Sequence, residues 1–178
     1  MTLTELLNGK PPEAFSSDQL RGKAHWRWDR DQHYAAFLLF DASWERGRVE
    51  GDETSANASR SRAAITLHQS GRNPDEAGER LDAVLRYYEA HPVRTDDRHF
   101  VEWVATALLE RQLTRDPAGF SAAFWRLREP CAAAGRANYP WIRPQRVQIA
   151  GWAEEAGARD VLRYLLPALK PNAPCPAP

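Results

Sequence analysis

The chain is poor in cysteine and has no net charge, and both features narrow the class of protein. Two cysteines, Cys131 and Cys175, cannot build a disulfide framework and lack the CxxC spacing of a zinc site. The 24 basic and 24 acidic residues cancel, which argues against a chain-wide electrostatic footprint for nucleic acid or an anionic membrane. No apolar run reaches the length of a membrane span, and the N-terminus has no signal-peptide pattern. We therefore expect a cytoplasmic protein with no membrane partner.

Several motifs that mark enzyme classes are also missing. The ten glycines are scattered and form neither GxxxxGK nor GxGxxG, the loops that cradle phosphates. No GxSxG segment supplies a nucleophile elbow, and Cys131 has no histidine near it in the sequence. The sequence therefore predicts no cofactor and no metal, and it leaves enzymatic activity as the less favoured interpretation.

The clearest signal that is present is one complete helix between Gly71 and Pro92. Asn73 can serve as its N-cap, and Pro74 occupies the first helical position. Five apolar residues then recur at helical spacing within an arc of roughly 100°, which predicts one buried stripe. These residues are Ala77, Leu81, Val84, Leu85 and Tyr88.

The same pattern recurs along the chain, and no segment shows the period-two alternation of a strand. The later helices fall into pairs joined by short connections, which is typical of antiparallel helix hairpins. The predicted fold is all-α, a single domain of about seven or eight helices stacked as in a helical repeat or an orthogonal bundle. The predicted helices cover residues 29–48, 56–69, 74–90, 96–115, 117–128, 144–156 and 158–169.

The ends of the chain differ from its middle. Residues 1–28 are predicted to pack on or flank the core, and residues 170–178 to form a disordered, proline-rich tail. Residues 29–169 make up the predicted helical domain. Within it, residues 47–57 are expected to form a polar, acidic loop, and the next helix, 56–69, has a small inner face that permits close helix packing.

One stretch resembles a degenerate tetratricopeptide-type unit. It begins at Leu67, and in it Gly71 ends a first helix, Ala77 opens a second and Pro92 closes it. The resemblance covers about a fifth of the chain, and it implies a helical-hairpin architecture without implying an activity.

Asp41 interrupts an apolar stripe at a position where helical spacing predicts burial. A buried carboxylate has to be paired or protonated, so Asp41 either pairs with an arginine, caps another helix, or serves as a binding or acid–base group. On the helix 96–115, His99 and Glu102 share a polar row that either faces solvent or lines a site. Together, Asp41, His99 and Glu102 define a possible pocket of an all-α enzyme or small-ligand-binding protein.

The segment 138–144 combines aromatic, proline and arginine residues and is the first partner-binding candidate. Tyr139, Trp141 and Arg143 are residue types enriched at binding hot spots, and the flanking prolines stiffen the segment. The alternative is that Trp141 fills a groove between two hairpins. If the segment binds a partner, Trp141→Ala should weaken the complex and leave the melting temperature within a few degrees.

A local basic cluster offers a third interpretation. Arg60, Arg62 and Arg72 can contact phosphates. Alternatively, they form a solvated helix face whose positive charge balances the acidic residues that precede it in the sequence. No aromatic residue is interleaved with them in the sequence, as a single-stranded nucleic-acid surface requires. Arginine is also the common basic residue of GC-rich bacterial genomes, and this chain has only Lys10, Lys23 and Lys170 as lysines.

The sequence therefore favours a non-enzymatic helical module that binds another protein, such as an adaptor, a complex subunit or an inhibitor of the immunity type. Seven tryptophans supply large areas for burial and recognition. The alternatives are the pocket at Asp41, His99 and Glu102 and, second, a nucleic-acid-associated subunit that uses the arginine cluster.

Overall fold

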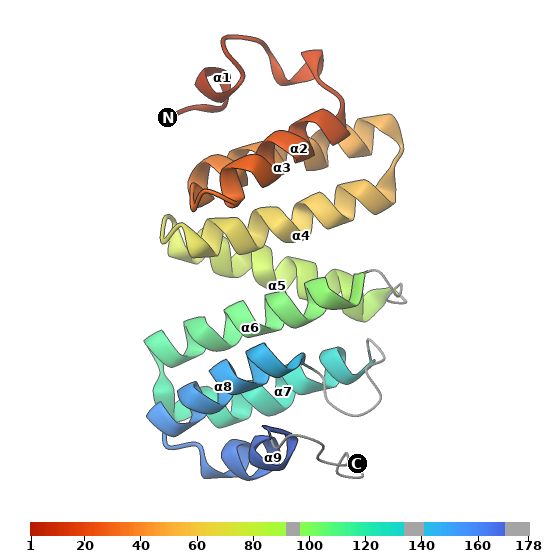
Figure 1. Cartoon of the computed structure of the whole chain (residues 1–178). Helices are drawn as coiled ribbons and strands as arrows, with labels where there is room; N and C mark the ends of the chain where they lie inside the picture. The colour runs from red at the N-terminus through yellow and green to blue at the C-terminus, as the bar shows by residue number, and fades with distance from the viewer. Residues whose placement is uncertain (92–96, 134–140, 170–178) are drawn as a thin grey trace. The chain divides into compact units, whose positions relative to one another are not determined.

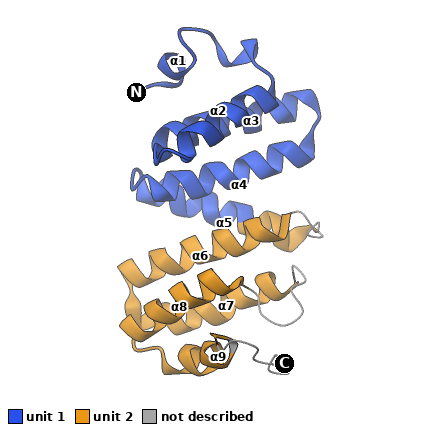
Figure 2. Ribbon diagram, in the orientation of Figure 1, with its two compact units in different colours: residues 1–84 blue, residues 85–178 orange. Residues whose placement is uncertain are grey.

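The computed structural model describes residues 1–91, 97–133 and 141–169 (Figure 1). These residues form helices and turns without a strand, so the all-α prediction is confirmed. The chain divides into two compact units, residues 1–84 and 85–178 (Figure 2). The boundary predicted at residue 28 falls inside unit 1, where the N-terminal segment joins the same core as the helices after it.

Unit 1 is a run of consecutive helices in which α3 packs against both α2 and α4 (Figure 1). A short helical turn at Pro12–Ala14 precedes α2, and α5 begins in unit 1 and continues into unit 2. The helices are α1 (Leu3–Leu6), α2 (Ser17–Trp28), α3 (His33–Glu50), α4 (Glu53–Gln69) and α5 (Pro74–Ala90).

Unit 2 contains two helix pairs in contact, α6 with α7 and α8 with α9. Both pairs match hairpins that the sequence predicts. The helices are α6 (Arg98–Arg115), α7 (Phe120–Ala133), α8 (Arg143–Glu155) and α9 (Arg159–Leu169). The predicted helix 117–128 ended before Pro130, but α7 continues to Ala133, because Cys131 extends the apolar face four residues beyond Leu127 and both are fully buried.

The helix between Gly71 and Pro92 forms as predicted. All five residues of its apolar stripe are buried, and Gly71, with φ +66°, ends α4 in the left-handed conformation that a glycine adopts without strain. Asn73 precedes the helix, with φ +45°, and its side-chain amide donates to the Glu76 carboxylate at 3.3 Å. Pro92 and the predicted tail lie outside the described residues.

The sequence prediction missed one helix and misplaced one loop. The missed helix is α2. Its start has a capping box, in which the side chains of Ser16 and Gln19 each accept the backbone N–H of the other residue. The acidic loop predicted at 47–57 is wrong: α3 runs to Glu50 and α4 begins at Glu53. The acidic residues there belong to a helix start, because the Asp52 carboxylate accepts the Ser55 N–H at 3.0 Å as an N-cap.

Polar contacts fasten α2 to α3 and α4 at one end of unit 1. The Ser17 hydroxyl donates to the Glu50 carboxylate at 2.6 Å, and the Ser17 N–H adds longer bonds to the same group. These bonds lower the pKa of Glu50. In the buried interior, the Ser43 hydroxyl bonds to the Ser17 carbonyl at 2.8 Å and lies 3.0 Å from the Ser59 hydroxyl. Serine side chains therefore connect three helices without leaving buried oxygens unpaired.

Helices α3 and α4 approach closely because small residues face each other. A Cβ added to Gly47 would lie 3.1 Å from the Cβ of Ala56 and 3.2 Å from its backbone. Ala56, Ser59 and Ala63 are all buried, so the predicted small face of α4 does form this contact.

We expect Gly47→Leu to lower the free energy of unfolding by about 1–3 kcal/mol, because the new side chain has to push α3 away from α4. The matched control is Gly22→Ala in α2, where nothing lies within 4 Å of an added Cβ. The control should raise the free energy of unfolding by about 0.5–1 kcal/mol, since alanine loses less backbone entropy in a helix. Urea unfolding followed by circular dichroism measures both, and a stabilising Gly47→Leu would contradict the close approach.

Candidate functional site

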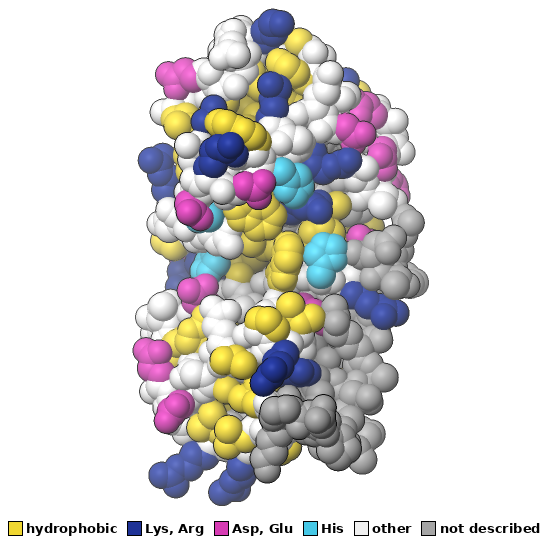
Figure 3. All heavy atoms as spheres, viewed as in Figure 1, with side chains coloured by type: hydrophobic (Ala, Val, Ile, Leu, Met, Phe, Trp, Pro, Cys, Tyr) yellow, Lys and Arg dark blue, Asp and Glu magenta, His cyan; other side chains and the backbone are white. Residues whose placement is uncertain are grey.

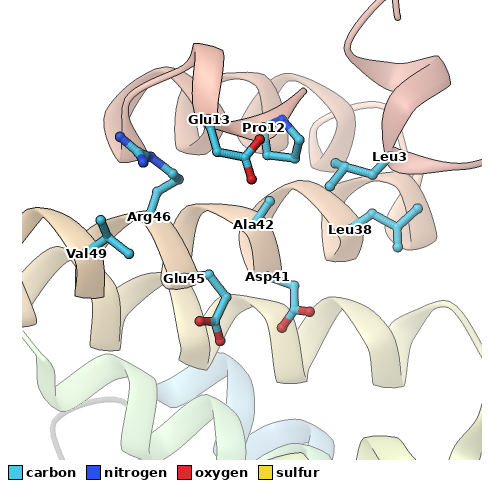
Figure 4. A pocket seen from close by; sticks show the side chains of 9 residues that line it. All are labelled: Leu3, Pro12, Glu13, Leu38, Asp41, Ala42, Glu45, Arg46 and Val49. Carbon is cyan, nitrogen blue, oxygen red and sulfur yellow. The ribbon is translucent and has the colours of Figure 1, made fainter. Parts of the chain in front are cut away.

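A cavity of unit 1 lies between the N-terminal segment and α3, and we call it the groove (Figure 4). It has a volume of about 370 Å³. Leu3 of α1 and the turn residues Pro12 and Glu13 form one wall. The α3 residues that complete the groove are Leu38, Asp41, Ala42, Glu45, Arg46 and Val49.

The groove has an apolar floor between carboxylates. Leu38, Ala42 and Val49 supply the floor on the α3 side, at steps of four and seven residues that keep them on one face of the helix. In Figure 4 Glu13 points toward α3 from one side, while Asp41 and Glu45 project from the opposite edge of the helix. The walls therefore place negative charge on both sides of an apolar strip.

Asp41 is held by an ion pair. Its carboxylate accepts a 2.6 Å hydrogen bond from Arg80 of α5, and Arg80 also donates to Glu76 at 2.9 Å. Burial alone lowers the pKa of Arg80, but the two carboxylates outweigh it and raise the pKa overall. The Asp41 side chain is 31% exposed, so it is only partly buried where helical spacing predicted burial. Of the predicted alternatives, the structure contains the pairing with an arginine.

A second hollow adjoins this ion pair. It has a volume of about 270 Å³ and is lined by Trp44, Arg60, Glu79, Arg80 and Ala83. Asp41 lines the groove and its partner Arg80 lines the second hollow, so the ion pair connects the two.

Arginines lie over aromatic rings along the same stripe of α3. The Arg72 guanidinium lies 4.3 Å from the centre of the Tyr34 ring, and the Arg60 guanidinium lies 5.3 Å from the Trp44 ring. Arg80 lies over Phe37 at 5.1 Å, between them along the helix. We call the surface made by Tyr34, Trp44, Arg60, Arg72 and Arg80 the Arg–aromatic face.

The pocket predicted at Asp41, His99 and Glu102 is not assembled in either unit taken by itself. Asp41 belongs to unit 1, where the groove that it lines is built from residues 3–49, whereas His99 and Glu102 belong to unit 2. His99 packs its ring against Phe100 and Trp103. The interpretation that this row faces solvent is wrong for Glu102, which is 1% exposed.

Glu102 lies instead near a buried thiol. Burial raises the pKa of Cys131, and the negative charge of Glu102 raises it further. The raised pKa favours the protonated thiol. Within the residues that the structure describes, no three His, Cys, Asp or Glu side chains come together as metal ligands.

Of the three residues predicted to bind a partner, the structure describes Trp141 and Arg143 and places them in different environments. Tyr139 lies outside the described residues. Trp141 is 0% exposed and stacks on Phe124 at 5.3 Å, so its indole is part of the unit 2 core and cannot touch a partner at the surface. Arg143 is exposed, and it donates to the Leu169 carbonyl at 3.4 Å. The alternative of a buried, space-filling Trp141 is the one that the structure contains.

The three arginines of the predicted basic cluster lie near different residues of unit 1. Arg60 and Arg72 lie over rings that are ten residues apart on α3, or about 15 Å along its axis. Arg62 faces α2 instead, where burial lowers the pKa of His25 and the charge of Arg62 lowers it further. Figure 3 shows Lys and Arg side chains of unit 1 dispersed among hydrophobic and acidic ones on the face in view. Aromatics are interleaved with two of these arginines after all, but they come from α3.

Comparison with protein-family models, with curated protein sequences and with solved structures gives no match to this chain. None of the helices in the described ranges combines the length and apolarity that crossing a bilayer requires.

Sequence reasoning missed the Arg–aromatic face and the groove. A signal for the first was present, because Tyr34, Phe37, Asp41 and Trp44 follow one another at helical steps of three and four. The stripe was interpreted as core, whereas Tyr34, Asp41 and Trp44 are only partly buried. The groove depends on where the N-terminal segment packs, and no periodic pattern in residues 1–15 indicates that.

Proposed function

We propose that this chain is a protein-binding module and that the Arg–aromatic face of unit 1 is its binding surface. The observation that carries the proposal is the series of arginine–aromatic contacts beside two adjacent hollows. Tryptophan, tyrosine and arginine are the residues enriched at protein interfaces and at their hot spots. Their rings and guanidinium groups are already ordered by mutual contact, which lowers the entropy lost on binding.

The charges of this face favour a protein over a nucleic acid. Asp41, Glu76 and Glu79 lie among the arginines, and two of the three are bonded to Arg80. A phosphate backbone is bound by an excess of positive charge, and alternating charges of both signs are typical of a surface that selects a protein partner. In the described part of unit 1, no three His, Cys, Asp or Glu side chains come together as metal ligands beside the hollows.

Trp44→Ala should weaken binding of the partner by at least about 30-fold, the effect of losing one central tryptophan hot spot. The partner is first isolated as a stoichiometric complex with the full chain from its native host and then purified. Isothermal titration calorimetry with the wild-type and variant chains measures the change in Kd.

The matched control is Trp26→Ala in α2. Trp26 is 49% exposed and also carries two arginines over its ring, at 4.9 and 3.9 Å, but it lies outside the Arg–aromatic face. We expect less than about a twofold change in Kd for this variant, since peripheral side chains contribute little. If Trp26→Ala weakens binding and Trp44→Ala does not, the proposed surface is wrong.

A further inference from the structure

We infer that the groove between the N-terminal segment and α3 binds a cationic amphipathic segment of the partner. This inference rests on the proposed function and specifies the chemistry of the partner. The lining of the groove carries more negative than positive side chains. Glu13, Asp41 and Glu45 line the groove against a single cation, Arg46, which is itself paired with Glu50 at 3.1 Å.

The three carboxylates of the groove differ in the hydrogen bonds and ion pairs that they already form within the chain. Asp41 is bonded to Arg80, and Glu45 has only an exposed pair with Arg48 at 3.3 Å, in which both side chains are more than half exposed. No hydrogen bond or ion pair joins Glu13 to another residue in the described ranges. Glu13 and Glu45 are therefore the two groups that a lysine or arginine of the partner can engage at little cost, one on each side of the floor.

The groove also contains an apolar strip. Leu3, Pro12, Leu38, Ala42 and Val49 present hydrophobic surface in a hollow of about 370 Å³. Val49 is 77% exposed, so a large apolar side chain at one end of the strip is open to contact. Covering this surface removes apolar area from water, which favours a segment with its own apolar side chains.

The length of the floor matches a short helix. From Leu38 to Val49 the floor runs eleven residues along α3, or about 16 Å, which equals three turns of a docked helix. A helix of that length presents apolar residues at i, i+4 and i+7 to the strip, with basic residues on both flanks facing the carboxylates. We therefore expect the partner segment to be a short helix with one apolar face and flanking lysines or arginines.

The test uses two labelled 14-residue peptides with leucines at i, i+3, i+4, i+7 and i+11, one with lysine and one with glutamate at the flanking positions. Fluorescence anisotropy measures their binding to the full chain. The lysine peptide should bind at least about tenfold more tightly than the glutamate peptide, and raising the salt from about 50 mM to about 300 mM should weaken it, because the flanking charges are exposed. Equal binding of the two peptides would overturn the inference.

Two variants locate the binding. Glu13→Gln combined with Glu45→Gln should weaken the lysine peptide about three- to tenfold, the effect of removing two exposed charges. Ala42→Arg, which adds bulk and positive charge to the floor, should weaken it by about tenfold or more. The matched control, Glu89→Gln, removes an exposed helical carboxylate outside the groove and should leave binding unchanged. An equal loss in this control, or no loss in the double variant, would refute binding in the groove.

These experiments distinguish a wrong inference about the groove from a wrong proposal about the Arg–aromatic face. If a purified partner depends on Trp44 while the lysine peptide does not bind, the groove inference is wrong and the binding surface stands. If the lysine peptide binds in the groove while the partner complex is insensitive to Trp44→Ala, the Arg–aromatic face is not the binding surface.

Discussion

Replacing Phe40 with alanine is expected to lower the free energy of unfolding by about 3–5 kcal/mol, the range for an aromatic residue removed from a packed core. Phe40 is 0% exposed in the core of unit 1. Its ring meets those of His25 and Trp28 edge to face, with centroids 5.1 and 5.8 Å away, so the loss includes aromatic contacts that connect α3 to α2.

Urea unfolding followed by far-ultraviolet circular dichroism measures this effect. Val49→Ala, also in α3 but 77% exposed, is the control and should change the free energy of unfolding by less than about 0.5 kcal/mol. Similar losses for the two variants would mean that α2 and α3 do not enclose the core described above.

Replacing Trp141 with alanine is expected to cost a similar amount, about 3–5 kcal/mol of the free energy of unfolding. The indole is 0% exposed and stacks on Phe124, whose ring also meets Tyr164 at 5.8 Å. Of the two interpretations that the sequence left open, partner binding by Trp141 predicted the opposite outcome, a small change in melting temperature with weaker partner binding. Burial decides between the two, because a side chain inside the core stabilises the fold whatever its residue type suggests for recognition.

The neighbouring residue provides a control for Trp141. Ile142 is 37% exposed, and Ile142→Ala should cost less than about 1 kcal/mol. Differential scanning calorimetry of the two variants separates the interpretations. An unchanged melting temperature for Trp141→Ala would return Trp141 to the surface and contradict its place in unit 2.

The helices themselves were largely predictable because their signals are local. The apolar stripe of α5, the helix end at Gly71 and the small face of α4 all follow from spacing and residue type. The errors occurred where the same residues are compatible with two different local structures. Asp52 and Glu53 are typical of a loop, yet they also favour a helix start, and Pro130 usually ends a helix unless the buried stripe continues past it.

The candidate site was less predictable because its parts come from distant positions in the chain. Asp41 was identified as unusual, but its partner Arg80 lies 39 residues later and nothing in the sequence pairs the two. Trp44 and Arg60 meet only after α3 and α4 pack through Gly47 and Ala56. Residue type suggested Trp141 as a hot spot, but its indole is fully buried, whereas the Trp44 side chain is only partly buried.

The most direct test of the central claim is amide hydrogen exchange of the full chain with and without its purified partner, followed by mass spectrometry. The account predicts slower exchange on binding in the peptides that cover residues 1–15, 34–49 and 76–84. These segments carry the groove and most of the Arg–aromatic face. Slower exchange confined to residues 97–169, with residues 1–84 unchanged, would contradict it.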